Sequence, residues 1–155
     1  MSEFALSESI VVAVTPDELY ALVSDVTRTG EWSPICTACW WDEGPAAQLG
    51  AWFIGRNETP ERSWETRSQV VAADPGLEFA WEVNNGWVRW GYTFEPVGPE
   101  ATRLTESWVF HPKGLAGFRE RFGEAADEQI QERRAAAVTG IPATLAAIKR
   151  VAEAT

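Results

Sequence analysis

The sequence predicts an α+β fold: a curved antiparallel sheet of about seven strands wrapped around a long C-terminal helix, with two short helices after the first strand. Three observations predict it. Apolar and polar residues alternate in consecutive segments, a helix-start motif follows the first of them, and the C-terminal segment carries an apolar stripe at helical spacing. One helix is too narrow to cover the buried face of such a sheet. The sheet must therefore curl around the helix, which commonly leaves an internal cavity.

The N-terminal elements are a strand and two short helices. Ser7–Val14 alternates and then becomes continuously apolar, which is typical of a strand. Thr15-Pro16-Asp17-Glu18 combines an N-cap threonine, a proline at the first helical position and a glutamate at N3, and so predicts a helix over Pro16–Ser24. A second short helix is predicted over Asp25–Glu31, because the turn Trp32-Ser33-Pro34 closes it.

The middle of the chain changes to a period of two and predicts further strands. Turn residues separate them, and Asn85-Gly86 is the strongest hairpin signal among these breaks. The predicted strands are Ile35–Asp42, Ala51–Glu58, Ser63–Ala73, Leu77–Asn84, Trp87–Pro96 and Thr102–Phe110.

The C-terminal segment returns to helical spacing. Its charged side chains lie away from an apolar stripe, as expected of a helix that packs on a sheet. Pro142, which follows Gly140, predicts a kink in this helix or its division in two. The stripe consists of Ile130, Val138, Ile141, Leu145 and Ile148.

Length, charge and composition bound the function. The 155 residues are expected to form a single domain, residues 1–155, large enough to bury a core without disulfides. A net charge of −10 argues against a nucleic-acid partner, because binding to phosphates needs clustered Lys and Arg. The N-terminus resembles no signal region and no apolar run reaches the length of a membrane span, so a cytoplasmic location without membrane insertion is expected. The sequence leaves the oligomeric state open.

Tryptophan is abundant, with nine indoles in the chain. Each indole buries roughly 150–250 Å² and presents a flat π face, so such rings would form good walls for a cavity that holds a flat apolar molecule. Strand propensity and core packing are the alternative explanation. Alternation along the strands and the helical stripe predict these ligand-binding residues: Trp64, Ser68, Phe79, Trp81, Trp90, Tyr92, Trp108, Val138 and Ile141. Trp40 and Trp41 are adjacent, so one of them faces inward in either register, and Trp41 is the candidate.

One acid interrupts the apolar pattern. Glu106 shares a face with Leu104, Trp108 and Phe110, where an isolated carboxylate must be paired, hydrogen-bonded or protonated with a raised pKa. A general acid or base in an apolar pocket has these properties, and the inward-facing Tyr92 could act with it. A position at the sheet end that reaches water, or a structural hydrogen bond to a helix, would also explain the acid. Glu106 and Tyr92 are thus the candidate catalytic residues.

The two cysteines and the single histidine do not predict a metal or redox site. Cys36 and Cys39 form a lone C-x-x-C inside a predicted strand, where positions three apart point to opposite faces. A redox pair of this spacing usually opens a helix after a strand, and a zinc site would need two more ligands. We therefore interpret both cysteines as reduced and structural and His111 as a strand-end residue. No metal and no cofactor are expected.

Several short motifs, spread over almost the whole chain, resemble those of a known family. They are Thr15-Pro16-Asp17-Glu18, Asp25-Val26 leading to Trp32-Ser33-Pro34, Gly55-Arg56-Asn57, Trp64-Glu65-Thr66-Arg67, Asp74-Pro75-Gly76, Phe94-Glu95-Pro96 and Thr102-Arg103-Leu104-Thr105-Glu106-Ser107. In their order and content they resemble the START-like (SRPBCC, helix-grip) proteins, and among these the bacterial polyketide cyclase/dehydrase-like group. The motifs are specific for the fold, and none of them defines a reaction.

This resemblance implies a helix-grip fold around a hydrophobic cavity. Members of the superfamily bind lipids, sterols, polyketides or plant metabolites, some are aromatase/cyclases, and related proteins activate a chaperone ATPase. The cyclases place an aromatic residue from the second short helix in the pocket, which implies a ligand-binding role for Trp32. They also tend to use cavity arginines, whereas alternation turns Arg67 outward. This difference favours binding over cyclisation.

The expected function is the binding of a hydrophobic, aromatic or polyketide-like small molecule in an internal cavity, for transport, sequestration or self-resistance in natural-product metabolism. The alternative is a polyketide aromatase/cyclase or dehydratase that uses Glu106 as general acid/base, so whether the chain is an enzyme stays open. Nothing basic or exposed in the sequence supports a chaperone-activating module.

Overall fold

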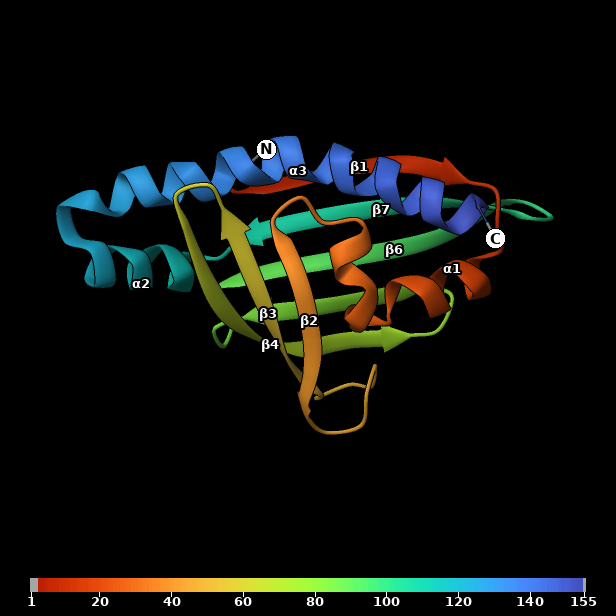
Figure 1. The fold of residues 1–155 in the computed structure, drawn as a ribbon, viewed down its shortest axis with the longest axis horizontal. Coiled ribbons are helices and arrows are strands. Elements are labelled where there is room, and N and C mark those ends of the chain that lie inside the picture. Colours follow the sequence, from red (N-terminus) through yellow and green to blue (C-terminus); the bar gives the residue numbers. More distant parts are fainter. Residues whose placement is uncertain (1–2, 155) are drawn as a thin grey trace.

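The computed structural model describes residues 3–154, which form a seven-stranded antiparallel sheet, two short helices in one connection and a helical C-terminal segment (Figure 1). The first strand lies at one edge beside the last, and the second strand forms the other edge, in the order β1-β7-β6-β5-β4-β3-β2. The strands are β1 (Ala5–Val12), β2 (Cys36–Glu43), β3 (Trp52–Thr59), β4 (Arg62–Asp74), β5 (Glu78–Val83), β6 (Val88–Gly98) and β7 (Ala101–Phe110).

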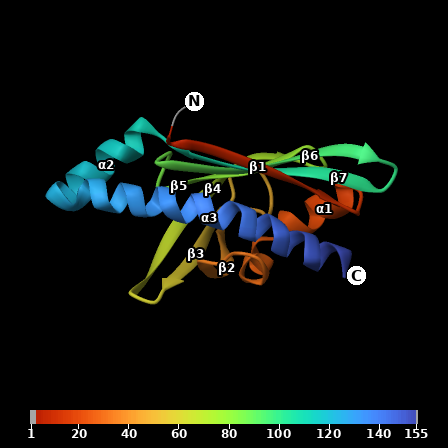
Figure 2. The ribbon, with the colours of Figure 1, turned by 90° about the horizontal axis from the view of Figure 1, so that it is seen from above.

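The sheet bends around the long C-terminal helix, as predicted (Figure 2). Register shifts mark the bulged strands: between Cys36 and Ala38 and between Trp41 and Glu43 in β2, and between Val70 and Ala72 in β4. Bulges bend a strand and increase its local twist, so these shifts help the sheet to turn. The expected fold class is confirmed.

The hairpin between β5 and β6 has the turn chemistry that the sequence indicates. Asn84, Asn85 and Gly86 all adopt positive φ angles of 52°, 57° and 93°. Asparagine and glycine tolerate this left-handed region better than other residues, and tight hairpin turns require it. The turn fixes a register in which Val83 pairs with Val88 and every inner side chain of β5 meets one of β6.

Two short helices, α1 (Pro16–Val23) and the 3₁₀-helix η1 (Val26–Glu31), carry the chain from the β1 edge to the β2 edge. The Thr15 hydroxyl accepts a hydrogen bond from the Glu18 amide at 3.2 Å and donates one to the Glu18 carboxylate at 2.9 Å. Asp25 caps η1 by accepting from the Thr27 amide at 3.2 Å. The predicted helix start is confirmed, and the second helix is a 3₁₀ turn.

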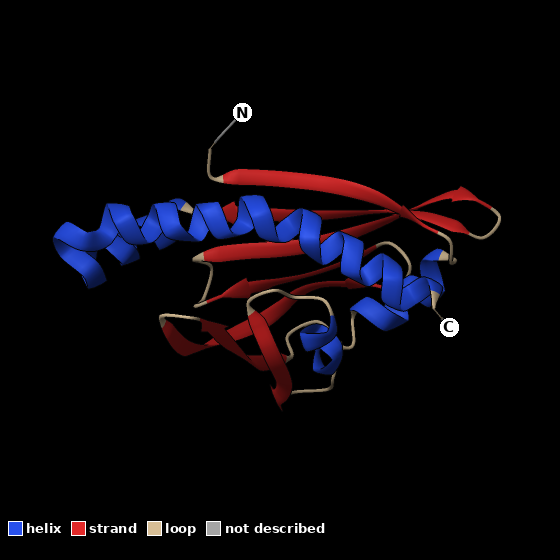
Figure 3. Ribbon diagram, turned by 45° about the horizontal axis from the view of Figure 1, so that its top comes forward, coloured by secondary structure: helices blue, strands red, loops and turns tan. Residues whose placement is uncertain are grey.

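The C-terminal segment contains two helices, with the break in a different place from the predicted one. It consists of α2 (Pro112–Phe122), the 3₁₀ turn η2 (Gly123–Ala125) and α3 (Ala126–Glu153). Gly123, with φ of 56°, lets α2 fold back beside the first half of α3 (Figure 3). Pro142 does not divide α3, so the predicted division of the helix at this residue is wrong. The helix continues through Pro142, which lies on its exposed side, where water can solvate the carbonyl group that lacks an amide donor.

Helix α3 packs along the inner face of the sheet and along β1. The Arg134 guanidinium donates to the Glu3 carbonyl at 2.6 Å, and the Lys149 ammonium donates to the Val11 carbonyl at 2.8 Å. Val138 lies on the same flank as these two side chains and is 46% exposed, so its predicted place in the buried stripe is wrong. The buried stripe instead contains Ile130, Ala137, Ile141, Leu145 and Ile148.

By length and composition alone, the segment Pro112–Glu153 includes one stretch apolar enough to cross a membrane. In this fold 44% of that stretch is buried, and it belongs to the helix that the sheet wraps around. Packing against the sheet therefore explains its apolar character.

Candidate functional site

The inner faces of β5, β6 and β7 carry two rows of side chains that lie side by side across the strands. Residues directly opposite each other in an antiparallel pair share a face and pack together. Trp81, Trp90 and Trp108 form the first row. Phe79, Tyr92 and Glu106 form the second row. The alternation predicted from the sequence therefore holds here, although Leu77 precedes β5 and is exposed.

Glu106 and Tyr92 make a buried acid–phenol pair. The Tyr92 hydroxyl donates to Glu106 Oε2 at 3.3 Å, and each residue is only 4% exposed. Glu106 Oε1 is buried without a hydrogen-bond partner within residues 3–154. Burial raises the pKa of the Glu106 carboxyl to about 8, and the hydrogen bond from Tyr92 offsets only part of this effect. Burial, together with the neighbouring carboxyl, also raises the pKa of Tyr92. At neutral pH Glu106 is thus mostly a protonated acid, which can donate a proton.

The aromatic side chains join into two connected clusters. In the first, Trp41 meets Phe53 with ring centroids 5.6 Å apart, Phe53 meets Trp81 at 5.8 Å, and Trp81 meets Tyr92 at 5.9 Å. The second runs from Trp90 through Trp108 and Phe110 to Phe118 on α2. Edge and tilted contacts of this kind are the favoured arrangement of aromatic pairs.

The other predicted ligand-binding residues are divided between this face and the core. Ser68 is buried opposite Phe53 in the β3–β4 register, so it shares the inner face. Trp32 follows η1 and is buried in the core, as is Ile141 on α3. Val138 is the exception, because its exposed flank of α3 faces away from the rows.

Trp64 lies beneath a group of arginines instead of within either cluster. The Arg62 guanidinium is 4.2 Å and that of Arg133 is 5.3 Å from the Trp64 ring centroid. Arg133, on α3, also stacks on Phe118 at 5.4 Å, and burial lowers the pKa of its guanidinium. Arg67 pairs on the outer side with Asp42, whereas Arg62, at the start of β4, lies on the face of Trp64 and pairs with Glu132 of α3 at 3.0 Å. The half-buried arginine of this region comes from the helix, which strand alternation could not reveal.

The cysteines do not lie as the sequence predicts. The sulfur atoms of Cys36 and Cys39 are 3.3 Å apart, so they are on the same side of β2. The bulge between Cys36 and Ala38 breaks the alternation on which the prediction of opposite faces relied. Both thiols are free, as expected. Near the end of β7, His111 Nε2 lies 3.4 Å from a Glu82 carboxylate oxygen but without hydrogen-bond geometry.

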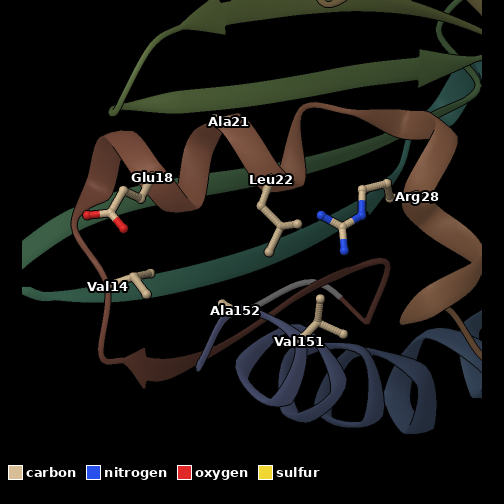
Figure 4. A pocket seen from close by; sticks show the side chains of 7 residues that line it. All are labelled: Val14, Glu18, Ala21, Leu22, Arg28, Val151 and Ala152. Atoms are coloured by element: carbon tan, nitrogen blue, oxygen red, sulfur yellow. The ribbon is translucent and has the colours of Figure 1, made fainter. Parts of the chain in front are cut away.

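Two hollows open at opposite ends of the molecule. One, of about 310 Å³, lies between α1, η1 and the end of α3, where Glu18, Leu22 and Arg28 face Val14 and Val151 (Figure 4). The other, of about 400 Å³, lies between the β5–β6 turn and α2 and includes Trp87 and Lys113. The predicted ligand-binding residues line neither of them.

Sequence reasoning missed three aromatic residues and one arginine in this region. Phe53 and Trp52 are neighbours in β3 and so point to opposite faces of the sheet. The alternation that placed Trp81 on the inner face could therefore have placed Phe53 there as well. Tyr20 on α1, whose ring is 6.1 Å from that of Phe79, and Phe118 on α2 come from helices whose packing the strand pattern does not report. Arg133 was missed for the same reason.

Comparison with known proteins agrees with this architecture. The family described as polyketide cyclase/dehydrase and lipid transport matches residues 3–153. A polyketide-cyclase-like protein of Corynebacterium glutamicum is 53% identical and superposes with a TM-score of 0.70, covering 97% of this chain and 91% of that one. An aromatase/cyclase of Streptomyces sp. R1128 superposes with a TM-score of 0.72 at 18% identity, covering 96% and 93% of the two chains. At that identity the likeness concerns the fold alone.

A curated relative, an uncharacterised protein of Mycobacterium tuberculosis, is 30% identical over 110 residues, or 70% of this chain. The chain spans about half, 49%, of that relative's length. The family match covers nearly the whole chain, and the curved sheet around α3 is the helix-grip arrangement. The protein therefore belongs to the polyketide cyclase/dehydrase and lipid transport family and has a START-like fold.

Proposed function

We propose that the chain binds a hydrophobic, aromatic or polyketide-like small molecule against the inner face of β5, β6 and β7. The observation that carries the proposal is the unpartnered Oε1 of Glu106, which lies on a face made mostly of aromatic rings. A buried polar atom without a partner costs free energy, so a ligand carbonyl or hydroxyl that bonds to it would gain affinity. The rings on either side would hold the flat part of such a ligand.

The ligand would enter by displacing side chains that are not fully buried. Phe79 and Trp108 are at most 2% exposed, whereas Trp81 and Trp90 are only partly buried. Moving the indoles of Trp81 and Trp90 would therefore break fewer packing contacts than moving Phe79 or Trp108. Neither described hollow includes Trp81 or Trp90, so the ligand is proposed to make room by moving these two indoles. Transport, sequestration and self-resistance are roles that such binding would serve.

Tryptophan fluorescence during titration tests this proposal. We expect flat polycyclic phenols to quench the emission and saturate, and linear fatty acids of similar mass to leave it unchanged. Trp90→Ala should weaken the affinity at least tenfold, because it removes a ring from the proposed wall. Trp40→Ala is the matched control, since Trp40 is 40% exposed, and it should bind as the wild type does. Equal affinity for both variants would show that the ligand binds elsewhere.

A second candidate function is a polyketide cyclase or dehydratase. Glu106 favours it, because a carboxyl with a pKa of about 8 can deliver a proton at neutral pH. The half-buried Arg133 guanidinium on Trp64 could hold an anionic group of the substrate. Glu106→Gln separates the two candidates: it should abolish turnover of a polyketide substrate if the acid is catalytic. Turnover that survives this change would exclude the acid/base mechanism, while binding without any turnover would leave the first proposal alone.

A further inference from the structure

The thiols of Cys36 and Cys39 form a pair that the fold brings together. Their sulfur atoms are 3.3 Å apart, although both cysteines lie in a strand and three positions separate them. The bulge between Cys36 and Ala38 adds one residue to β2, and this brings both cysteine side chains to the same side of the strand. No other cysteine occurs in the sequence, so each thiol has one possible partner within the chain.

The neighbouring strand leaves room for this pair. Gly55 of β3 stands directly opposite Cys39, and a Cβ atom there would lie 3.4 Å from the Cys36 sulfur and 3.6 Å from that of Cys39. Both distances are ordinary van der Waals contacts, so β3 packs directly against the two sulfur atoms at this position. On the other side, Thr29 of η1 is near enough to the Cys39 thiol to help lower its pKa. The two sulfur atoms therefore lie in contact beside Gly55.

The two thiols are not equivalent. Hydrogen bonds from Cys36 and then from Thr29 lower the pKa of Cys39, and the same bond, together with burial, raises the pKa of Cys36. The Cys36 thiol also donates to the Ala38 carbonyl at 3.5 Å, which favours retention of its proton, and this geometry makes Cys39, which is 9% exposed, the candidate nucleophile. A buried thiolate next to a protonated thiol is the arrangement of a nucleophile with a resolving cysteine.

We propose that Cys36 and Cys39 are a redox-active dithiol that a small peroxide converts into an intrachain disulfide. The Cys39 thiolate attacks one peroxide oxygen; an S–O bond forms, the O–O bond breaks, and the leaving hydroxide takes a proton to become water. The Cys36 sulfur then attacks the Cys39 sulfur; the S–S bond forms, the S–O bond breaks, and a second water leaves with the Cys36 proton. The dithiol loses two electrons and the peroxide gains them.

Burial selects the oxidant by size. Hydrogen peroxide can reach a thiolate that is 9% exposed, whereas the sulfur of glutathione disulfide is shielded by its peptide arms. Oxidation of the pair does not depend on the ligand proposal.

The test uses the reduced full-length chain and hydrogen peroxide in equimolar amount. We expect an intact mass lower by two hydrogen atoms, no alkylation by iodoacetamide, and full recovery of both thiols with dithiothreitol. Glutathione disulfide should give the same product much more slowly. An interchain dimer on a non-reducing gel, or a gain of oxygen atoms without loss of hydrogen, would overturn the proposal. Equal rates with the two oxidants would overturn the selection by size.

Matched variants separate the roles of the two cysteines. In Cys36→Ser, Cys39 should stop at the sulfenic acid and be trapped by dimedone. Cys39→Ser should react far more slowly with peroxide, because the remaining thiol keeps its proton. Thr29→Val should slow oxidation of the wild-type pair severalfold at neutral pH. If Cys36→Ser and Cys39→Ser react at the same rate, the assignment of Cys39 as nucleophile is wrong.

Discussion

The two halves of the sheet differ in regularity and in the size of their inner side chains. From β5 to β7 most inner positions hold rings, and the β6–β7 register runs from Val88 opposite Phe110 to Pro96 opposite Thr102 before it shifts at the end of the hairpin. From β2 to β4 the inner positions near the thiols hold small or polar residues, and both β2 and β4 contain bulges. The regular half places side chains in rows, which brings Tyr92 to Glu106. The bulged half breaks the rows, which brings Cys36 to Cys39.

The largest expected effect is on the regular half. Trp108→Ala should lower the free energy of unfolding by about 3–5 kcal/mol, because a fully buried ring in contact with Trp90 and Phe110 leaves a cavity. Urea denaturation followed by far-ultraviolet circular dichroism measures this change. Trp40→Ala on the bulged half is the control, and its effect should stay within about 0.5 kcal/mol. Similar losses for both variants would mean that the halves do not differ in packing.

The second effect concerns the acid in the regular half. The folded chain holds a proton on Glu106 up to a pKa of about 8, whereas the ordinary value for the unfolded chain is 4.5. Stability from this group is therefore full below pH 4.5 and is lost as the pH rises toward 8. Between pH 5 and pH 7 the loss is about 2–3 kcal/mol for a single site.

Glu106→Gln isolates this contribution, because the amide does not titrate. Denaturation curves at several pH values should show the wild type losing stability relative to the variant as the pH rises from 5 to 7. A constant difference between the two proteins would mean that Glu106 has an ordinary pKa in the folded chain.

The third effect is on the bulged half, where η1 lies close to β2. A Cβ atom at Gly30 would collide with the Thr37 carbonyl oxygen, so Gly30→Ala should cost about 1–2 kcal/mol through forced movement of η1. Gly140→Ala in α3 is the matched control, because its new Cβ would lie 3.8 Å from the Pro34 ring and alanine favours a helix. Thermal unfolding should rank Gly30→Ala below the wild type and Gly140→Ala at or above it.

The sequence predicts the regular half far better than the bulged half. Period-two alternation identifies the faces of β5, β6 and β7, and the positions of Trp81, Tyr92 and Glu106 follow from it. A bulge adds a residue without any marker in the local pattern, so the meeting of Cys36 with Cys39 could not be predicted.

Helical side chains were harder to place. The break between α2 and α3 follows Gly123, which permits a positive φ, whereas the stronger sequence signal at Pro142 has no such effect because its side of the helix is exposed. The exposure of Val138 and the stacking of Arg133 on Trp64 depend on how α3 is rotated against the sheet. That rotation is set by contacts with β1, which lie far away in sequence.

The inner face of the sheet holds a protonated acid, Glu106, that we propose is available to a ligand. The most direct measurement is a titration of the Glu106 side-chain carboxyl by carbon-13 NMR, with Glu106→Gln used to assign the signal. We predict a midpoint near pH 8, and a further change in its chemical shift when a polycyclic phenol binds. A midpoint near the ordinary value of 4.5 would contradict the account.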